Sequence, residues 1–409
     1  MKLVIAEKPS VAMALASVLG ARTRKDGYVE GNGYIVSWCV GHLVGLCDAS
    51  EYDEKYKKWR YEDLPIVPEC WKHKILEGTK KQFGILKKLM RDSEVNEVIC
   101  ATDAGREGEL IFRLVYEQAG CRKPMKRLWI SSMEEQAIKD GFVSLKDGSC
   151  YESLYQSALC RAKADWLVGI NASRLFSVLY NQNLKVGRVQ TPTLAMIVDR
   201  NQKIKEFTKE KYYMAHIKFD DMDAVTEHFQ KKEDADKVAA ECQERMCEVE
   251  KDDVKEKTVR PPKLYDLTTL QREANRMFGY TAQQTLDAVQ EMYEQKLITY
   301  PRTDSQYLTD EMGESTETLI QMLFGKMPYA EGLEYQSDVS KVLNSKKVSD
   351  HHAIIPTMEV AKADIGELKE RSRKILYLIS ARVLTATADP YIYESHKCQI
   401  TCNYHTFYL

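Results

Sequence analysis

The spacing of apolar residues in the first 148 positions predicts strands and helices that alternate along the chain. Apolar runs of strand length occur in KLVIAE, GYIVSWCV, EVICATD and KRLWISS, and segments with a helical period lie at 10–20, 79–92 and 107–120. Strands that alternate with helices are typical of a mostly parallel sheet with helices on its faces. Ligands of such sheets bind beyond the carboxyl ends of the strands. We therefore expect an α/β domain with a binding site at that edge.

The rest of the chain has a pattern that predicts mainly helices. A helical period covers 150–208, strand segments surround a charged helix within 210–256, and helices return over 264–388. Two consecutive prolines in VRPPKLYD separate the last two of these regions, as expected of a boundary. The final YIYESHKCQITCNYHTFYL alternates like a strand or hairpin. The fold class is thus expected to be multidomain, α/β followed by mainly α.

Composition narrows the class of protein only a little. The 409 residues have a formal net charge of −2, which is compatible with a local basic groove for nucleic acid. No apolar run reaches about 18 residues, and MKLVIAEKPS resembles a buried strand more than a signal peptide, so we expect a cytoplasmic protein without a membrane span. The eleven cysteines are scattered without a CxxC pair, so we expect reduced thiols and no zinc site.

Three acidic residues occupy positions from which they can meet at one edge of the sheet. Glu7 and Asp103 each end a predicted strand, and Glu107 lies near the start of a helix. If the two strands are neighbours, the carboxylates converge and suit Mg²⁺, which uses few protein carboxylates and keeps several waters. The alternative is a solvated surface in which Arg106 pairs with one acid. Lys8 is either an exposed loop lysine or, near a phosphate, a proton donor to a leaving oxygen.

The segment LITYPRTDS brings a tyrosine and an arginine together just after a predicted helix. Pro301 disfavours a helical conformation at Tyr300, so the chain should leave the helix in an extended conformation. Tyrosine is a covalent nucleophile in some group transfers, and the planar guanidinium of Arg302 matches two phosphate oxygens. Tyr300 is therefore either a nucleophile beside a phosphate clamp or a buried structural tyrosine.

Five motifs, in the order VIAEKPSVA, ATDAGREGEL, VGRVQTPTLAMIV, ITYPRTDS and DHHAIIPT, resemble those of type IA DNA topoisomerases, most closely the bacterial topoisomerase III branch. The likeness runs along essentially the whole chain. It implies a Toprim domain with a Rossmann-like fold at 1–148, followed by the domains of the topoisomerase ring. These are part of a helical domain at 149–208 with a groove for single-stranded DNA, part of an arch at 209–260, the domain with the catalytic tyrosine at 261–389, and the start of a returning arch strand at 390–409.

The resemblance also implies roles in the chemistry for individual residues. Tyr300 matches the nucleophile, Arg302 matches the arginine that stabilises the scissile phosphate, and Lys8 matches the lysine that assists the leaving 3′ oxygen. His351 matches a histidine near the active site, in contact with phosphate or with Asp103. These residues, with Glu7, are the expected catalytic set.

The metal site and the DNA groove follow from the same resemblance. Glu7, Asp103 and Glu107 match the acidic residues that bind Mg²⁺. The positions that match segments gripping the single strand are Arg161, Asp165, Arg174, Arg188 and Gln190.

The chain departs from the family pattern in two respects. Many relatives carry a second aspartate where this chain has Gly105, so metal binding is expected to depend on Glu7, Asp103, Glu107 and water, with weaker or differently shaped coordination. The sequence also stops within CQITCNYHTFYL, inside the expected returning strand. We therefore expect a C-terminally truncated chain with an incomplete ring.

The implied activity is Mg²⁺-dependent, ATP-independent cleavage of one DNA strand through a 5′-phosphotyrosine, with strand passage and religation. The chain has no GxxxxGK[ST] motif, in agreement with this. The expected partner is single-stranded or underwound duplex DNA, bound by a monomer associated with the nucleoid; the sequence identifies no partner helicase. Two alternatives are a Toprim nuclease or primase-like polymerase, which needs no Tyr300, and a truncated chain that only binds single-stranded DNA.

Overall fold

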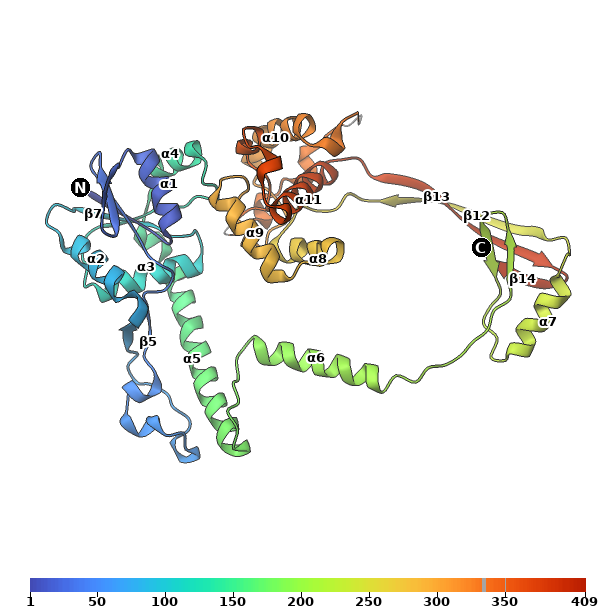
Figure 1. Cartoon of the computed structure of the whole chain (residues 1–409), viewed down its shortest axis with the longest axis horizontal. Helices are drawn as coiled ribbons and strands as arrows, with labels where there is room; N and C mark the ends of the chain where they lie inside the picture. Colours follow the sequence, from blue (N-terminus) through green and yellow to red (C-terminus); the bar gives the residue numbers. More distant parts are fainter. Residues whose placement is uncertain (333–335, 350) are drawn as a thin grey trace. The chain divides into compact units, whose positions relative to one another are not determined.

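The computed structural model describes residues 1–332, 336–349 and 351–409. Over these residues the chain divides into two compact units. The first unit combines Met1–Thr193 with Pro262–Thr387, and the second combines Leu194–Pro261 with Ala388–Leu409. Each unit is thus built from two segments that are distant in the sequence (Figure 1).

The first unit contains a mixed sheet with the strand order β2-β3-β4-β1-β7-β8-β9. The strands are β2 (Thr23–Lys25), β3 (Tyr28–Gly31), β4 (Tyr34–Trp38), β1 (Lys2–Ala6), β7 (Glu97–Ala101), β8 (Met125–Arg127) and β9 (Lys146–Asp147). The central strands β4, β1, β7 and β8 are parallel, and β1 is buried on both faces, as is usual for parallel sheets. In register, Ala6 pairs with Trp38 and with Ala101, so the residues that follow β1, β4 and β7 meet at one edge.

Helices cover both faces of this sheet (Figure 1). Val4 and Ala6 belong to the core beneath α1 (Pro9–Leu19) and α4 (Glu135–Val143), whereas Leu3 and Ile5 belong to the core beneath α2 (Lys80–Arg91) and α3 (Arg106–Gln118). This division follows from the alternation of side chains along a strand. The apolar run of β1 therefore serves two cores at once.

The first turns of a long helix, α5 (Glu152–Tyr180), pack on α3. The later turns contact the segment that connects β5 (Val44–Leu46) with β6 (His73–Ile75). The side chain of Asn171 accepts from Ile66 N (2.6 Å) and donates to Ile66 O (2.9 Å). The indole of Trp166 donates to Cys47 O (2.9 Å). These bonds fasten the 47–66 segment to α5. The 47–66 segment contains three short 3₁₀ turns, at Ala49–Glu51, Glu54–Lys57 and Tyr61–Asp63.

The second segment of the first unit is mainly helical. Its helices are α8 (Leu267–Phe278), α9 (Ala282–Glu294), α10 (Gly313–Lys326) and α11 (Glu370–Ala386). A capping box between Thr281 and Gln284 begins α9, and Lys296, with a φ of 66°, follows its end. The chain then runs extended through Tyr300, where Thr299 N donates to Ile355 O (2.9 Å).

The second unit is a sheet in the order β10-β11-β14-β13-β12, packed against α7 (Lys232–Cys242). Its strands are β10 (His216–Phe219), β11 (Met222–Val225), β12 (Glu248–Val259), β13 (Tyr391–Cys402) and β14 (His405–Tyr408). The β13–β14 hairpin turns at Asn403 and Tyr404, which both have positive φ, as a type I′ turn requires. Helix α6 (Gln190–Lys205) begins in the first unit and ends in the second.

The expected fold class, α/β followed by mainly helical domains, is confirmed, but the sheet is mixed rather than mostly parallel. Two tight hairpins, at Asp26–Gly27 and Asn32–Gly33, add the antiparallel strands β2 and β3. The strand predicted over 126–132 ends at Arg127, because its neighbour β7 ends at Ala101. No helix in the described part of the chain is both long and apolar enough to span a membrane.

Candidate active site

Two carboxylates meet at the sheet edge where β1 and β7 end. Glu7 directly follows β1, and Asp103 lies two residues beyond β7. Because β1 and β7 are parallel neighbours, both side chains reach the same edge, and Asp103 N donates to Glu7 Oε2 (3.3 Å). Glu7 is buried and Asp103 is half-buried. The predicted convergence of these two acids is therefore present.

Tyr300 reaches this pair from the other segment of the unit. Its hydroxyl donates to Asp103 Oδ2 (3.0 Å), and its backbone N donates to Ser131 O (3.1 Å). Only 8% of the tyrosine is exposed, and its ring lies edge-on to Tyr293, with centroids 5.3 Å apart. Tyr300 is thus buried, as expected of a structural tyrosine, and its hydroxyl also faces the acidic pair; its role as a nucleophile stays a prediction.

The carboxylates and the phenol control one another's ionisation. Burial, followed by the charge of Asp103, raises the pKa of Glu7 to about 7. Burial also raises the pKa of Asp103, while Lys8, the Tyr300 hydroxyl and Arg302 act in the opposite direction. Burial, and then the charges of Asp103 and Glu7, raise the pKa of Tyr300 well above its usual value. The phenol is therefore protonated at neutral pH and donates to the carboxylate.

A cavity of about 570 Å³ opens beside these groups, and Arg302 and Arg161 line it with the two carboxylates and Tyr300. Arg302 is exposed, so its guanidinium is available to an anionic ligand. Lys8 is the N-cap residue of α1, and its Nζ lies 3.6 Å from Glu294 Oε1. The expected cations are thus close to the acidic pair, although Lys8 has an acidic partner of its own.

Glu107 lines the same cavity but does not join Glu7 and Asp103. Its carboxylate lies 2.6 Å from His42 Nε2, and this hydrogen bond is the main reason why the pKa of Glu107 is lowered. Within the described residues, no three His, Cys, Asp or Glu side chains are grouped so that they could hold a metal ion. The expected convergence of three carboxylates therefore reduces to two. His42 follows β4, the other parallel neighbour of β1, and so reaches the same edge.

His351 packs on the tyrosine rather than on Asp103. Its ring centroid lies 4.3 Å from that of Tyr300, and its Nδ1 lies 3.1 Å from Ser131 Oγ. Burial lowers the pKa of His351 to about 4, so the imidazole is neutral at pH 7. Asp350, which begins the DHHAIIPT motif, lies outside the described residues.

The other residues expected to grip DNA lie apart from the catalytic cavity, with the exception of Arg161. Asp165 forms an ion pair with Arg188 (2.5 Å). Arg174 is buried and stacks on Trp59, with its guanidinium 5.4 Å from the ring centre. Gln190 is the first residue of α6.

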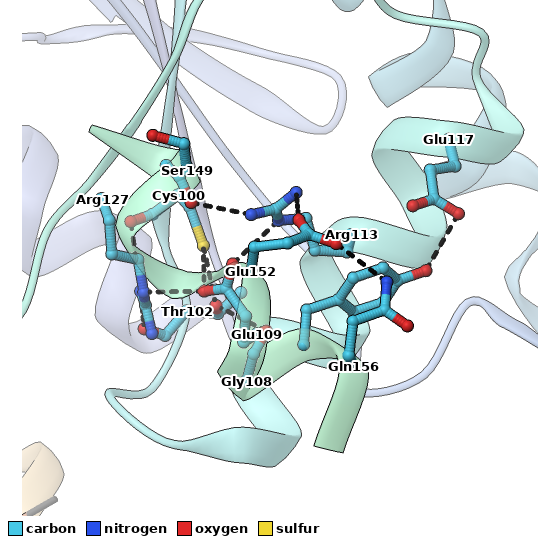
Figure 2. Close-up of polar contacts among 12 residues, drawn as sticks. Cys100, Thr102, Gly108, Glu109, Arg113, Glu117, Arg127, Ser149, Glu152 and Gln156 are labelled. Carbon is cyan, nitrogen blue, oxygen red and sulfur yellow. Dashed lines mark hydrogen bonds and ion pairs between the residues drawn. The ribbon is translucent and has the colours of Figure 1, made fainter. Parts of the chain in front are cut away.

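Sequence reasoning missed Arg127, which holds the backbone at Thr102 and Asp103. Figure 2 shows Arg127 beside Thr102 and Glu109. Arg127 donates to Thr102 O and Asp103 O, each at 2.7 Å. Its Nε lies 3.1 Å from Glu109 Oε2, and Glu109 Oε1 accepts from Arg113 Nε (2.9 Å). Arg127 and Glu109 are each 1% exposed. The sequence could have indicated this pair, because Arg127 lies in an apolar strand run and Glu109 in an apolar helix run. A charged residue that is buried in such a run needs a partner of opposite charge.

The two glycines of ATDAGREGEL, Gly105 and Gly108, differ in whether the packing around them requires glycine. A Cβ on Gly108 would lie 2.1 Å from Asp103 O, so only glycine lets α3 approach the end of β7 this closely. The backbone of Gly105 is extended, and a Cβ there would meet no heavy atom within 4 Å. A side chain at 105 would therefore fit at the cavity wall, and its absence reflects no packing constraint.

Comparison with known proteins identifies the family of the chain. The family described as DNA topoisomerase matches residues 149–409, and the Toprim domain matches residues 2–133. The chain is 44% identical to DNA topoisomerase 3 of Shouchella clausii, over 98% of this chain and 57% of the relative. It is 42% identical to DNA topoisomerase 3 of Bacillus subtilis, over 96% of this chain and 56% of the relative. Full-length topoisomerase I of Thermotoga maritima superposes with a TM-score of 0.73 at 25% identity, over 100% of this chain and 64% of that structure.

The chain therefore belongs to the DNA topoisomerase family, as a type IA member with an N-terminal Toprim domain. The relatives to which it is similar are DNA topoisomerase 3 proteins. It spans about 57% of the length of these relatives.

Proposed function

We propose that this chain cleaves one strand of DNA by forming a 5′-phosphotyrosine at Tyr300, as the catalytic part of a type IA topoisomerase. The observation that carries this proposal is the 3.0 Å hydrogen bond from the Tyr300 hydroxyl to Asp103, beside the buried Glu7. The bond places the phenol oxygen beside a group that can accept its proton; because the two carboxylates raise the pKa of Tyr300, the proton would leave only during the attack on phosphorus.

In the proposed step, the Tyr300 oxygen attacks a backbone phosphorus in line with the 3′ oxygen. A bond forms between phosphorus and the phenol oxygen, and the bond from phosphorus to the 3′ oxygen breaks. Asp103 accepts the proton of the phenol, and Lys8 donates a proton to the leaving oxygen after releasing Glu294. Arg302 stabilises the charge on the phosphate, and the neutral His351 supports the tyrosine ring. Reversal of these transfers reseals the strand.

The two carboxylates fit a magnesium ion. Glu7 and Asp103 repel each other when both are ionised, and burial together with this repulsion raises the pKa of Glu7 to about 7. Glu7 and Asp103 would hold Mg²⁺ with several waters; Glu107 would join them only by giving up His42. When bound, the ion offsets the negative charge of the acids and helps to orient the DNA for religation.

The proposed substrate is single-stranded or underwound DNA, with the strand running from α5 to Tyr300. Arg161 would contact a phosphate at the catalytic cavity, and the more distant Asp165, Arg174, Arg188 and Gln190 are proposed to contact the approaching strand. The energy of the broken bond is kept in the phosphotyrosine, so no ATP is needed. Strand passage, and with it relaxation or decatenation, is proposed for the longer protein that the relatives represent.

A labelled oligonucleotide tests the proposal. With a label at the 3′ end, the label should migrate with the denatured protein; with a label at the 5′ end, it should leave on a shortened free fragment. Tyr300→Phe should abolish both products, whereas Tyr293→Phe, a change in the adjacent ring, should keep them. Cleavage that persists in Tyr300→Phe would favour the nuclease, and binding without any adduct in the parent chain would favour the DNA binder.

A further inference from the structure

Three cysteines of the second unit converge where α7 ends and β12 begins. Cys242 is the last residue of α7, Cys247 directly precedes β12, and Cys402 is the last residue of β13. The Cys242 thiol donates to Cys402 O (3.3 Å), and the Cys402 thiol donates to Cys242 O (3.8 Å). These two residues are 160 positions apart, so the cluster joins the two chain segments that form this unit. All three are free thiols in the structure.

Cys247 and Cys402 lie opposite each other on neighbouring strands. The antiparallel register of β12 and β13 pairs Glu248 with Thr401, so the next pair along the ladder is Cys247 with Cys402. Residues that oppose each other in a ladder project from the same face of the sheet. Both thiols therefore project from the face that packs on α7, where Cys402 meets Cys242.

The hydrogen bonds of β13 show which kind of cross-strand pair this is. Cys398 and Leu409 exchange both of their backbone hydrogen bonds (3.1 and 3.0 Å), so the polar backbone groups of Cys398 point toward β14. The same holds for every second residue along β13, including Cys402. Toward β12, Cys402 thus belongs to a non-hydrogen-bonded pair, in which the Cα atoms are about 4.5 Å apart and the side chains are closest. A disulfide needs a Cα separation of about 4.4–6.8 Å, so this pair can be bridged without moving the backbone.

The two thiols differ in their access to solvent. Cys402 is fully buried, whereas Cys247 is exposed and borders a cavity of about 870 Å³ beside α7. A small reagent therefore reaches Cys247 first. Burial raises the pKa of both thiols, so the reactive thiolate is scarce at neutral pH. Exchange with a disulfide is thus slow at neutral pH and faster at higher pH.

We propose that Cys247 and Cys402 form a site of reversible oxidation, which reacts with a low-molecular-weight disulfide to give a cross-strand disulfide bond. The Cys247 thiolate attacks one sulfur of the small disulfide, forms a mixed disulfide and releases the first small thiol. The Cys402 thiolate then attacks the Cys247 sulfur, forms the bond between the two residues and releases the second small thiol. The protein loses two hydrogen atoms, and the small disulfide is reduced to two thiols.

The bond would close a covalent loop around the segment that carries Tyr300. Positions 247 and 402 lie on either side of Pro262–Thr387 in the sequence, and both belong to the second unit. In the reduced chain, β12 and β13 are held together by their ladder and by the packing around it. In the oxidised chain, the two strands cannot separate until the bond is reduced.

Peptide mapping of the parent chain tests the pairing. The chain is incubated with oxidised glutathione at about pH 8, the remaining thiols are blocked with N-ethylmaleimide, and the tryptic digest is analysed by mass spectrometry without reduction. We expect peptide 246–251 to be linked to peptide 398–409. The rate of linking should rise about tenfold from pH 7 to pH 8, as the thiolate becomes more abundant. A link from 238–245 to 398–409, unlinked peptides alone, or a rate independent of pH would each overturn the proposal.

Single substitutions separate the two steps. Cys402→Ser should stop at the mixed disulfide, with glutathione retained on peptide 246–251, and Cys247→Ser should give neither the mixed disulfide nor the link. Cys398→Ser is the matched control, because Cys398 lies in the same tryptic peptide and strand but opposes Asp252, so this variant should link as the parent chain does. Loss of the link in Cys398→Ser, or its persistence in Cys247→Ser, would overturn the assignment.

Discussion

The buried ion-pair network beneath Asp103 offers the most direct quantitative test of the fold. Glu109 lies between Arg127 (3.1 Å) and Arg113 (2.9 Å), and its side chain is 1% exposed (Figure 2). Glu109→Gln keeps the shape of the side chain but removes its charge. Two guanidinium groups then share a site with no full negative charge between them, and Arg127, which is also 1% exposed, cannot turn to solvent.

The expected cost is large compared with the stability of a typical domain. Removing one partner of a buried ion pair costs about 3–5 kcal/mol, because the other charge remains buried without compensation. Folded domains are stable by only about 5–15 kcal/mol. We therefore expect Glu109→Gln to lower the free energy of unfolding of the first unit by about 3–5 kcal/mol.

Intrinsic fluorescence isolates this unit in a urea titration. All five tryptophans lie between positions 38 and 166, within Met1–Thr193, so their emission reports on the first unit alone. Glu152→Gln is the matched control, because Glu152 pairs with Arg113 at 3.1 Å but is 52% exposed, and it should cost less than about 1 kcal/mol. If Glu109→Gln costs no more than Glu152→Gln, the reasoning about the buried network is refuted.

Three further predictions concern the site and the helix that leads to it. Asp103→Asn should slow adduct formation at Tyr300 by about 100-fold or more, measured by rapid quench with the 3′-labelled oligonucleotide; an unchanged rate would exclude Asp103 as the proton acceptor. Because burial lowers the pKa of His351 from 6.5 to about 4, the folded state should lose stability as the pH falls through this range. The loss is about 1.4 kcal/mol by about pH 5.5, and His351→Gln should abolish this part of the pH dependence in urea titrations; an unaltered pH profile would contradict it. Thr281→Ala removes the capping box with Gln284 and should cost about 1 kcal/mol by the same measurement, so a cost near zero would show that the cap contributes nothing.

The sequence was informative where a single pattern decides the structure. Apolar runs that end in an acid predicted that Glu7 and Asp103 would share an edge, because parallel neighbours end together. The hairpins at Asp26–Gly27 and Asn32–Gly33 carried equally clear turn signals, but the polar strand TRK between them and α1 had no apolar alternation to mark it.

Long-range pairings could not be obtained from such patterns. Tyr300 meets Asp103 across 197 positions, and only the ordered motifs of the family implied this meeting. Glu107 resembled a third metal ligand until the structure paired it with His42, a residue 65 positions away. Arg174 was expected in the groove for single-stranded DNA, and no local pattern shows that it is buried where the 47–66 segment packs on α5. Each of these outcomes depends on which segments pack together.

The hydrogen bond from Tyr300 N to Ser131 O has a mechanical consequence. With the contacts from Ser131 Oγ to His351, from Met358 N to Glu134 and from the Tyr300 hydroxyl to Asp103, it joins the tyrosine segment to the Toprim segment, and the two segments also share an apolar core. Among the described residues, no strand pairing crosses this joint. Each such bond contributes only about 1 kcal/mol net, since water replaces the lost partner when the bond opens. Separating the two segments would break these bonds and expose the apolar surface that they share, but it would leave the hydrogen bonds within the helices and sheets on either side intact.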